Sequence, residues 1–130
     1  ENIGTKGNPK LAKEQPIYVQ WDSKAPKPGW NWWNPESKTL ATQWRTTPTA
    51  IDWNKDNLMD LITLDHEGYL SYFERYKSDD QLFLKPGKRI FYSYPGSYNR
   101  KNKPTDSIAG LLRLNTEENG HSGRRKLAFG

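Results

Sequence analysis

The chain has 130 residues, with 20 Lys and Arg against 15 Asp and Glu, six Trp and no Cys. This length fits one domain or part of one, and the lack of Cys excludes disulfides and thiolate zinc sites. The apolar runs are too short for a transmembrane helix, and the first residues do not resemble a signal peptide. An aromatic content of 13% with a net charge of only +5 predicts a folded domain. Because the chain starts at Glu1 rather than Met, we expect a mature or excised fragment.

The pattern along the chain predicts an all-β, antiparallel fold. Nine Pro and ten Gly are spread over the whole length, and no long stretch keeps the apolar spacing of a helix. Short apolar runs between turn residues are typical of strands instead. The expected strands are 16–21, 40–44, 49–53, 58–64, 69–76, 89–94, 110–114 and 125–129.

One turn and two long loops can be placed between these strands. Residues 65–68 end in Gly68, which suits a left-handed turn position, so the flanking strands should form a hairpin. Those two strands carry apolar residues on both faces, which predicts a sheet covered on both sides. Residues 22–37 and 96–106 are rich in Pro or polar residues, and we expect long irregular loops there.

The motif with the most specific spacing lies between two expected strands. Oxygen-bearing side chains fall at loop positions 1, 3, 5 and 9, and position 7 can offer a backbone carbonyl. These residues are Asp52, Asn54, Asp56, Asp60 and, through its carbonyl, Leu58. Ca²⁺ takes six to eight oxygen ligands, and alternate residues of a tight loop can supply them. The spacing therefore predicts a calcium site.

Asn57 occupies position 6 of this loop, where the chain turns sharply with a positive φ. Gly is the usual residue there, and Asn is the next best tolerated. The alternative interpretation is a plain Asx-rich hairpin turn that binds no metal. Three carboxylates that converge without a cation would repel one another, which favours the ion.

Residues 49–62, followed by 67–73, resemble an FG-GAP (VCBS-type) repeat, the blade unit of integrin-α-like β-propellers. That family runs from strand to calcium loop to strand, then through a tight Gly turn to the next strand. The sequence departs from the family at Asn57, where Gly is preferred. Weaker likenesses at 2–11 and 123–130 resemble the end of one blade and the start of another.

The resemblance implies a partial propeller of about two blades. The implied organisation is a blade end at 1–21, a Trp- and Pro-rich insertion at 22–48, a complete repeat at 49–94, a loop-rich insertion at 95–122 and a blade start at 123–130. It also implies a structural Ca²⁺, and a secreted, periplasmic or cell-surface location in bacteria. The expected role is a non-catalytic binding or scaffold module of a larger protein that handles polysaccharide.

Six Trp raise the question of a sugar-binding surface. Trp30, Trp32 and Trp33 lie in the Pro-rich segment and are the candidates to stack on carbohydrate, including acidic polysaccharide. The alternative is that these large aromatic residues pack between blades, as buried aromatic side chains usually do.

Three further hypotheses concern partners and activity. The parent protein could be a propeller-type polysaccharide lyase or glycosidase, for which His66, Tyr69 and Arg75 are the nearby candidates, or an adhesion module of integrin type. An open fragment would leave strand edges that pair with another copy. Basic clusters near 85–89, 100–103 and 124–126 could attract nucleic acid or acidic polysaccharide, but the interspersed acidic residues favour solvated charge. We expect neither a nucleic-acid nor a membrane partner.

Overall fold

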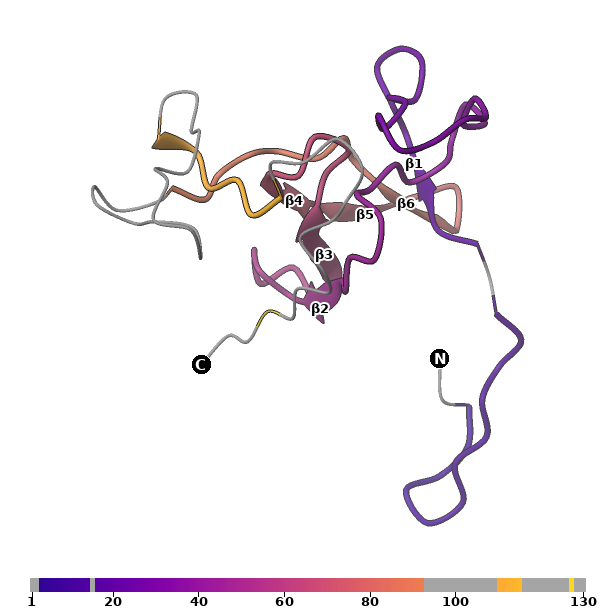
Figure 1. Cartoon of the computed structure of the whole chain (residues 1–130). Helices are drawn as coiled ribbons and strands as arrows, with labels where there is room; N and C mark the ends of the chain where they lie inside the picture. The colour runs from indigo at the N-terminus through magenta and orange to yellow at the C-terminus, as the bar shows by residue number, and fades with distance from the viewer. Residues whose placement is uncertain (1–2, 15, 93–109, 116–126, 128–130) are drawn as a thin grey trace.

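The computed structural model describes residues 3–14, 16–92, 110–115 and 127 (Figure 1). Within them the chain forms two small sheets and no α-helix, which confirms the all-β prediction. The strands are β1 (Tyr18–Val19), β2 (Thr49–Ile51), β3 (Asp60–Leu64), β4 (Leu70–Phe73), β5 (Arg75–Ser78) and β6 (Gln81–Leu84). No helix among the described residues is long and apolar enough to cross a membrane.

The first sheet has the order β2–β3–β4, and all its pairs are antiparallel. Its central strand β3 and its neighbour β4 are buried at every position, as the apolar residues on both faces predicted. The turn between them is also as expected: Gly68 has a φ of +87°. A Cβ at Gly68 would collide with the backbone carbonyl of Asn115, so glycine is required there for a second reason.

The second sheet has the order β1–β6–β5. The expected strand 69–76 is interrupted at Glu74, and its second half forms β5, which turns back into β6. Asp79 and Asp80 both have positive φ, as a two-residue hairpin turn requires. β6 was not predicted, and β1 pairs with it in parallel, so the wholly antiparallel prediction was wrong for this pair.

Two apolar clusters cover opposite sides of the first sheet. One joins the two sheets and consists of Val19, Leu61, Phe73 and Leu84, with Trp21 and Leu40 packed against it. The other consists of Ile62, Leu64, Leu70 and Tyr72, with partly buried residues at its edge. Because Leu61 and Ile62 point to different clusters, the two-residue period of β3 directs neighbouring side chains to opposite faces.

Other expected strands form only single bridges. Residues 40–44 make one bridge, between Thr42 and Asp65, directly after the end of β3. Lys88 bridges Tyr72 of β4, and Arg113 bridges Tyr69 just before β4, whereas Tyr92 bridges Leu111. Residues 22–37 contain no strand, as predicted. The expected strand 125–129 and the loop 96–106 fall outside the described residues, except for Leu127.

Candidate functional site

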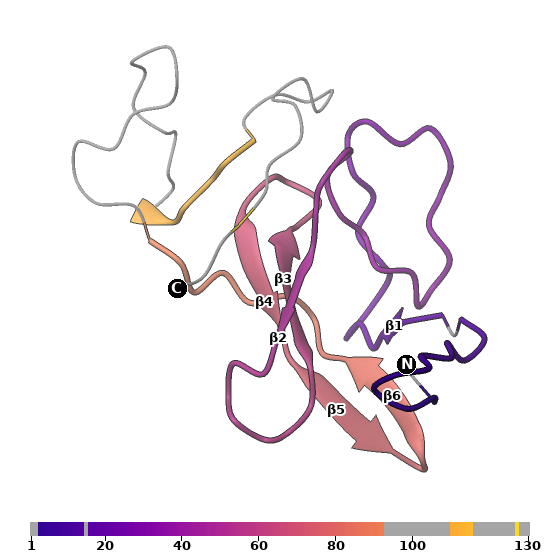
Figure 2. The same cartoon turned by 90° about the horizontal axis from the view of Figure 1, so that it is seen from below.

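The loop from Asp52 to Asp60 connects β2 with β3 and projects beyond their ends (Figure 2). Its side-chain oxygens accept hydrogen bonds from three successive backbone amides. Asp52 accepts from the amides of Asp56 at 3.1 Å and Asn57 at 3.0 Å, and Asp56 accepts from the amide of Leu58 at 2.8 Å. The Asp56 bond closes an Asx turn, and the two Asp52 bonds reach four and five residues ahead, so together they wind the loop around the carboxylates of positions 1 and 5.

Asn54 lies in the same network. Its side-chain oxygen accepts from the amide of Asp56 at 3.2 Å, and its side-chain nitrogen donates to the Asp56 carboxylate at 2.8 Å. Asn57 has a φ of +69°, which confirms the left-handed conformation predicted for position 6. Lys55 also adopts a positive φ, of 62°, which was not expected. The loop therefore brings three of the predicted side chains together: Asp52, Asn54 and Asp56.

The Asp60 side chain does not join this hydrogen-bond network and lies in the protein interior. It is fully buried, and its carboxylate accepts from the amide of Trp53 at 3.0 Å and from the amide of Arg75 at 2.8 Å. A third bond comes from the Tyr72 hydroxyl at 3.1 Å. Burial and this bond to Asp60 raise the pKa of Tyr72 above its ordinary value. Asp60 thus ties the loop to β4 and to the start of β5.

The donor set fits a hard cation only in part. A carboxylate offers about four acceptor positions, and at Asp60 three of them are occupied by protein groups. Asp52, Asn54 and Asp56 have acceptor lone pairs that the hydrogen bonds from backbone amides do not use. The backbone carbonyl of Leu58 is the next predicted ligand along the loop. Over the described ranges, no three His, Asp or Glu side chains are grouped so that they could hold a metal ion.

The Trp-rich segment forms an exposed aromatic cluster, which we call the indole cluster: Trp30, Trp32, Trp33 and Trp44. Trp30 lies at its centre, with ring centroids 5.8 Å from Trp33 and 6.5 Å from Trp44. Trp32 is 85% exposed, Trp44 50% and Trp33 47%. Two of the three candidate rings, Trp32 and Trp33, are therefore open to solvent.

Hydrogen bonds hold the indole cluster in place. The Trp30 indole donates to the backbone carbonyl of Thr42 at 3.2 Å, and buried Asn31 accepts from the amide of Trp33 at 3.1 Å. The guanidinium of Arg45 lies 4.8 Å from the centre of the Trp44 ring. The sequence pattern placed Trp44 in a strand. Its contact with Trp30 could not be predicted, because only folding brings these two residues together.

The candidates for an enzyme lie in different surroundings. Tyr69 is buried, and its hydroxyl has no hydrogen-bond partner among the described residues. His66 is partly exposed in the hairpin turn, with Nε2 4.0 Å from Glu67 Oε2. Arg75 lies on β5 in the other sheet, where its backbone amide binds Asp60. No hydrogen bond or ion pair of the described chain links these three candidates.

An ionic network at the hairpin turn was missed by sequence reasoning. Arg89 donates to Asp65 at 2.6 Å and to Glu67, and its guanidinium lies 4.0 Å from the centre of the Tyr69 ring. Arg113 lies over the same ring at 5.2 Å. The bond from Arg89 lowers the pKa of Glu67. Arg89 thus serves the fold, although its basic cluster was interpreted as solvated charge.

A scan against protein-family models and searches of the curated proteins and the solved structures found no match to this chain.

Proposed function

We propose that this chain is a calcium-stabilised, non-catalytic module that binds polysaccharide as part of a larger secreted bacterial protein. The choice of polysaccharide as the ligand rests on the indole cluster, in which Trp32 is 85% exposed. Sugar rings present flat C–H faces that stack on aromatic rings, and large exposed apolar patches commonly mark binding sites. The hydrogen bonds at Trp30 and Trp33 support a platform that is ordered before the ligand arrives.

We further propose that Ca²⁺ is held in the loop by Asp52, Asn54, Asp56 and the carbonyl of Leu58, whereas the buried Asp60 serves the fold rather than the ion. The support is the oxygen spacing together with the positive φ of Asn57. Bound Ca²⁺ would neutralise the loop carboxylates and hold the β2–β3 connection in one conformation. Water would complete the coordination.

We propose that β2 to β6 belong to one FG-GAP-like repeat and that β1 belongs to the end of the preceding blade, in a partial propeller of about two blades. The support is the strand–loop–strand–turn–strand order from β2 to β4, with the Gly68 turn in the expected place. A partial propeller exposes strand edges, and pairing of two copies through such an edge is part of the same proposal. Light scattering at high protein concentration tests it, and a monomer would contradict it.

Polysaccharide binding is tested by affinity electrophoresis in gels that contain neutral or acidic polysaccharides. We expect retardation in at least one gel and at least tenfold weaker binding for Trp32→Ala, which removes the most exposed ring. Trp53→Phe is the control, because Trp53 lies outside the indole cluster and packs on Phe91. Equal binding by Trp32→Ala and the native chain, or no retardation in any gel, would refute the proposal.

Calcium binding is tested by thermal unfolding. A ligand that binds only the folded state stabilises it by about 2.7 kcal/mol at 100 times its Kd. The melting temperature should therefore rise in millimolar Ca²⁺ and fall with chelator, and Asp52→Asn should abolish this response. An unchanged melting temperature would leave the Asx-rich hairpin turn as the correct interpretation.

A lyase or glycosidase remains the competing proposal for the parent protein. Screening the full-length protein on acidic polysaccharides separates it from the binding role, because a binding module produces no shortened or unsaturated product. Binding to a protein partner, with no response on a glycan array, would favour the adhesion role instead.

A further inference from the structure

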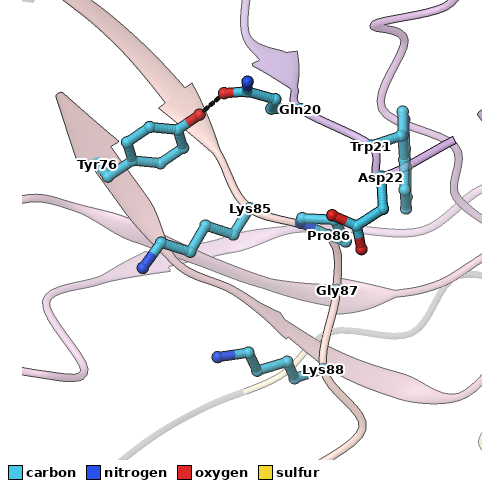
Figure 3. A pocket seen from close by; sticks show the side chains of 8 residues that line it. All are labelled: Gln20, Trp21, Asp22, Tyr76, Lys85, Pro86, Gly87 and Lys88. Carbon is cyan, nitrogen blue, oxygen red and sulfur yellow. Dashed lines mark hydrogen bonds between the residues drawn. The ribbon is translucent and has the colours of Figure 1, made fainter. Parts of the chain in front are cut away.

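A groove of about 690 Å³ lies between the chain after β1 and the β5–β6 hairpin (Figure 3). It is lined by Gln20, Trp21 and Asp22 on one side, Tyr76 of β5 on another, and residues 85–88 after β6. This volume is within the range of ligand sites in proteins, about 300–1,000 Å³. The groove shares no residue with the indole cluster or the 52–60 loop.

Backbone contacts hold the walls of the groove in position. The amide of Gln20 donates to the carbonyl of Leu84 at 2.9 Å, and the amide of Lys85 donates to the carbonyl of Glu74 at 2.8 Å. A Cβ on Gly87 would lie 2.6 Å from the ring of Phe73, so the chain passes directly over this core side chain. Both walls are thus fixed to the interior of the protein.

The aromatic side chains of the groove are fixed as well. The Trp21 indole donates to the carbonyl of Thr39 at 2.9 Å and packs edge-on against Phe73, with ring centroids 6.5 Å apart. The Tyr76 ring stacks on Phe83 at 5.9 Å, and its hydroxyl donates to the side-chain oxygen of Gln20. Both rings are only partly buried, so each keeps an exposed part that can contact a ligand.

The charges are divided between two parts of the groove. Lys85 and Lys88 share one carboxylate, Glu74, at 2.6 Å and 3.7 Å, which leaves one positive charge in excess. The hydrogen bond that Lys85 donates to Glu74 raises the pKa of Lys85, so this ammonium stays charged at neutral pH. In the view of Figure 3 both lysine side chains extend to one side of Pro86, and the carboxylate of Asp22 is drawn on the other side.

We propose that this groove binds an acidic oligosaccharide, with one uronate carboxylate against Lys85 and Lys88. The sugar rings contact Trp21 and Tyr76, and sugar hydroxyls donate to Asp22 and bond with Gln20. One excess positive charge matches one carboxylate, and the carboxylate of Asp22 suits neutral hydroxyls rather than a second anion. This inference rests on the proposed polysaccharide role and names its ligand class and a second contact surface.

The test uses the full ¹⁵N-labelled chain and follows its Trp indole N–H signals by NMR. Each signal is assigned by a single Trp→Phe substitution. The probes are tetragalacturonate and its carboxyl-reduced, neutral counterpart. We expect tetragalacturonate to shift the Trp21 signal, the neutral tetramer to bind at least tenfold more weakly, and added salt to weaken the acidic probe only.

Lys88→Gln should weaken binding of tetragalacturonate by at least tenfold. The matched control is Lys77→Gln, because Lys77 is equally exposed but pairs with Asp80 at 2.7 Å, away from the groove. Lys77→Gln should bind like the native chain.

The other outcomes overturn the inference in distinguishable ways. A shift of the Trp32 or Trp33 signals with an unchanged Trp21 signal would refute the groove and keep the proposed function. Equal affinity for both tetramers, or no effect of Lys88→Gln, would refute the acidic ligand. If no indole signal moves with any polysaccharide, both proposals fail.

Discussion

Replacing Asp60 tests whether this residue acts mainly through the fold or mainly through the ion. Its buried carboxylate is the common acceptor for the amide of Trp53, the hydroxyl of Tyr72 and the amide of Arg75. Asp60→Ala removes all three bonds at once. We therefore expect a large loss of stability that is the same with and without Ca²⁺.

The size of this loss follows from the surroundings of the three donors. A hydrogen bond to a charged group contributes about 1.5–3 kcal/mol, and a buried donor without a partner costs about 1–3 kcal/mol. Trp53 and Arg75 are partly exposed, so water can replace the acceptor for their amides, whereas the Tyr72 side chain is buried. We expect Asp60→Ala to lower the free energy of unfolding by about 3–5 kcal/mol, a large part of the 5–15 kcal/mol typical of a domain.

Urea unfolding followed by Trp fluorescence measures this loss, once in chelator and once in millimolar Ca²⁺. Asp56→Ala is the matched control, because the exposed Asp56 belongs to the same loop but bonds only within it. It should cost about 1 kcal/mol or less in chelator, as expected for an exposed position. A double-mutant cycle of Asp60→Ala with Tyr72→Phe should show a coupling of about 0.5–3 kcal/mol.

Two results would refute the reasoning. One is a loss for Asp60→Ala in chelator as small as that for Asp56→Ala, which would mean that the buried carboxylate contributes nothing without the ion. The other is additive behaviour of Asp60→Ala and Tyr72→Phe, which would mean that the 3.1 Å hydrogen bond between Asp60 and Tyr72 carries no energy.

Three further outcomes follow from the same structure. Tyr69→Phe should leave the free energy of unfolding unchanged or raise it by about 1 kcal/mol, because the buried hydroxyl has no partner within the described residues. Gly68→Ala should cost about 2 kcal/mol or more, since its φ is +87° and its Cβ would meet the Asn115 carbonyl. Burial and Asp60 raise the pKa of Tyr72 above 10.0, so its contribution is complete below pH 10.0 and is lost as the pH rises toward the folded value.

Each of these has its own control. Tyr72→Phe should destabilise at neutral pH where Tyr69→Phe does not, and equal losses in urea unfolding would contradict the assignment of the buried hydroxyl. Gly7→Ala, at a position with open space around it, should be nearly neutral beside Gly68→Ala. Tyr72→Phe should also lessen the alkaline loss of stability, and an unchanged pH profile between pH 9 and 12 would show that another group causes it.

Local chemistry was enough to predict part of this fold. Gly68 could be placed in a left-handed turn, and Asn57 in a positive φ, because few residue types tolerate these conformations. Burial of β3 and β4 on both faces followed from the apolar residues that each strand carries on both of its faces. These features depend on residues that are neighbours in sequence, so the sequence contains the information directly.

The errors involve partners that are distant in sequence. The parallel pairing of β1 with β6 and the approach of Trp44 to Trp30 have no local signal. The burial of the Asp60 side chain did have a local signal, which the loop spacing concealed. Side chains two apart on a strand share a face, and Asp60 is two residues before Ile62, which points into the core. The loop spacing alone grouped Asp60 with Asp52.

The pairing of β1 with β6 also affects the order in which the protein can form. When Tyr18 and Val19 are synthesised on the ribosome, their partners Phe83 and Leu84 have not yet been added to the chain. The β5–β6 hairpin contains only local contacts and can close by itself, whereas β1 can pair only after β6 has been synthesised. The groove wall formed by Gln20 and Trp21 follows directly after β1, so this binding surface also depends on a strand made more than sixty residues later.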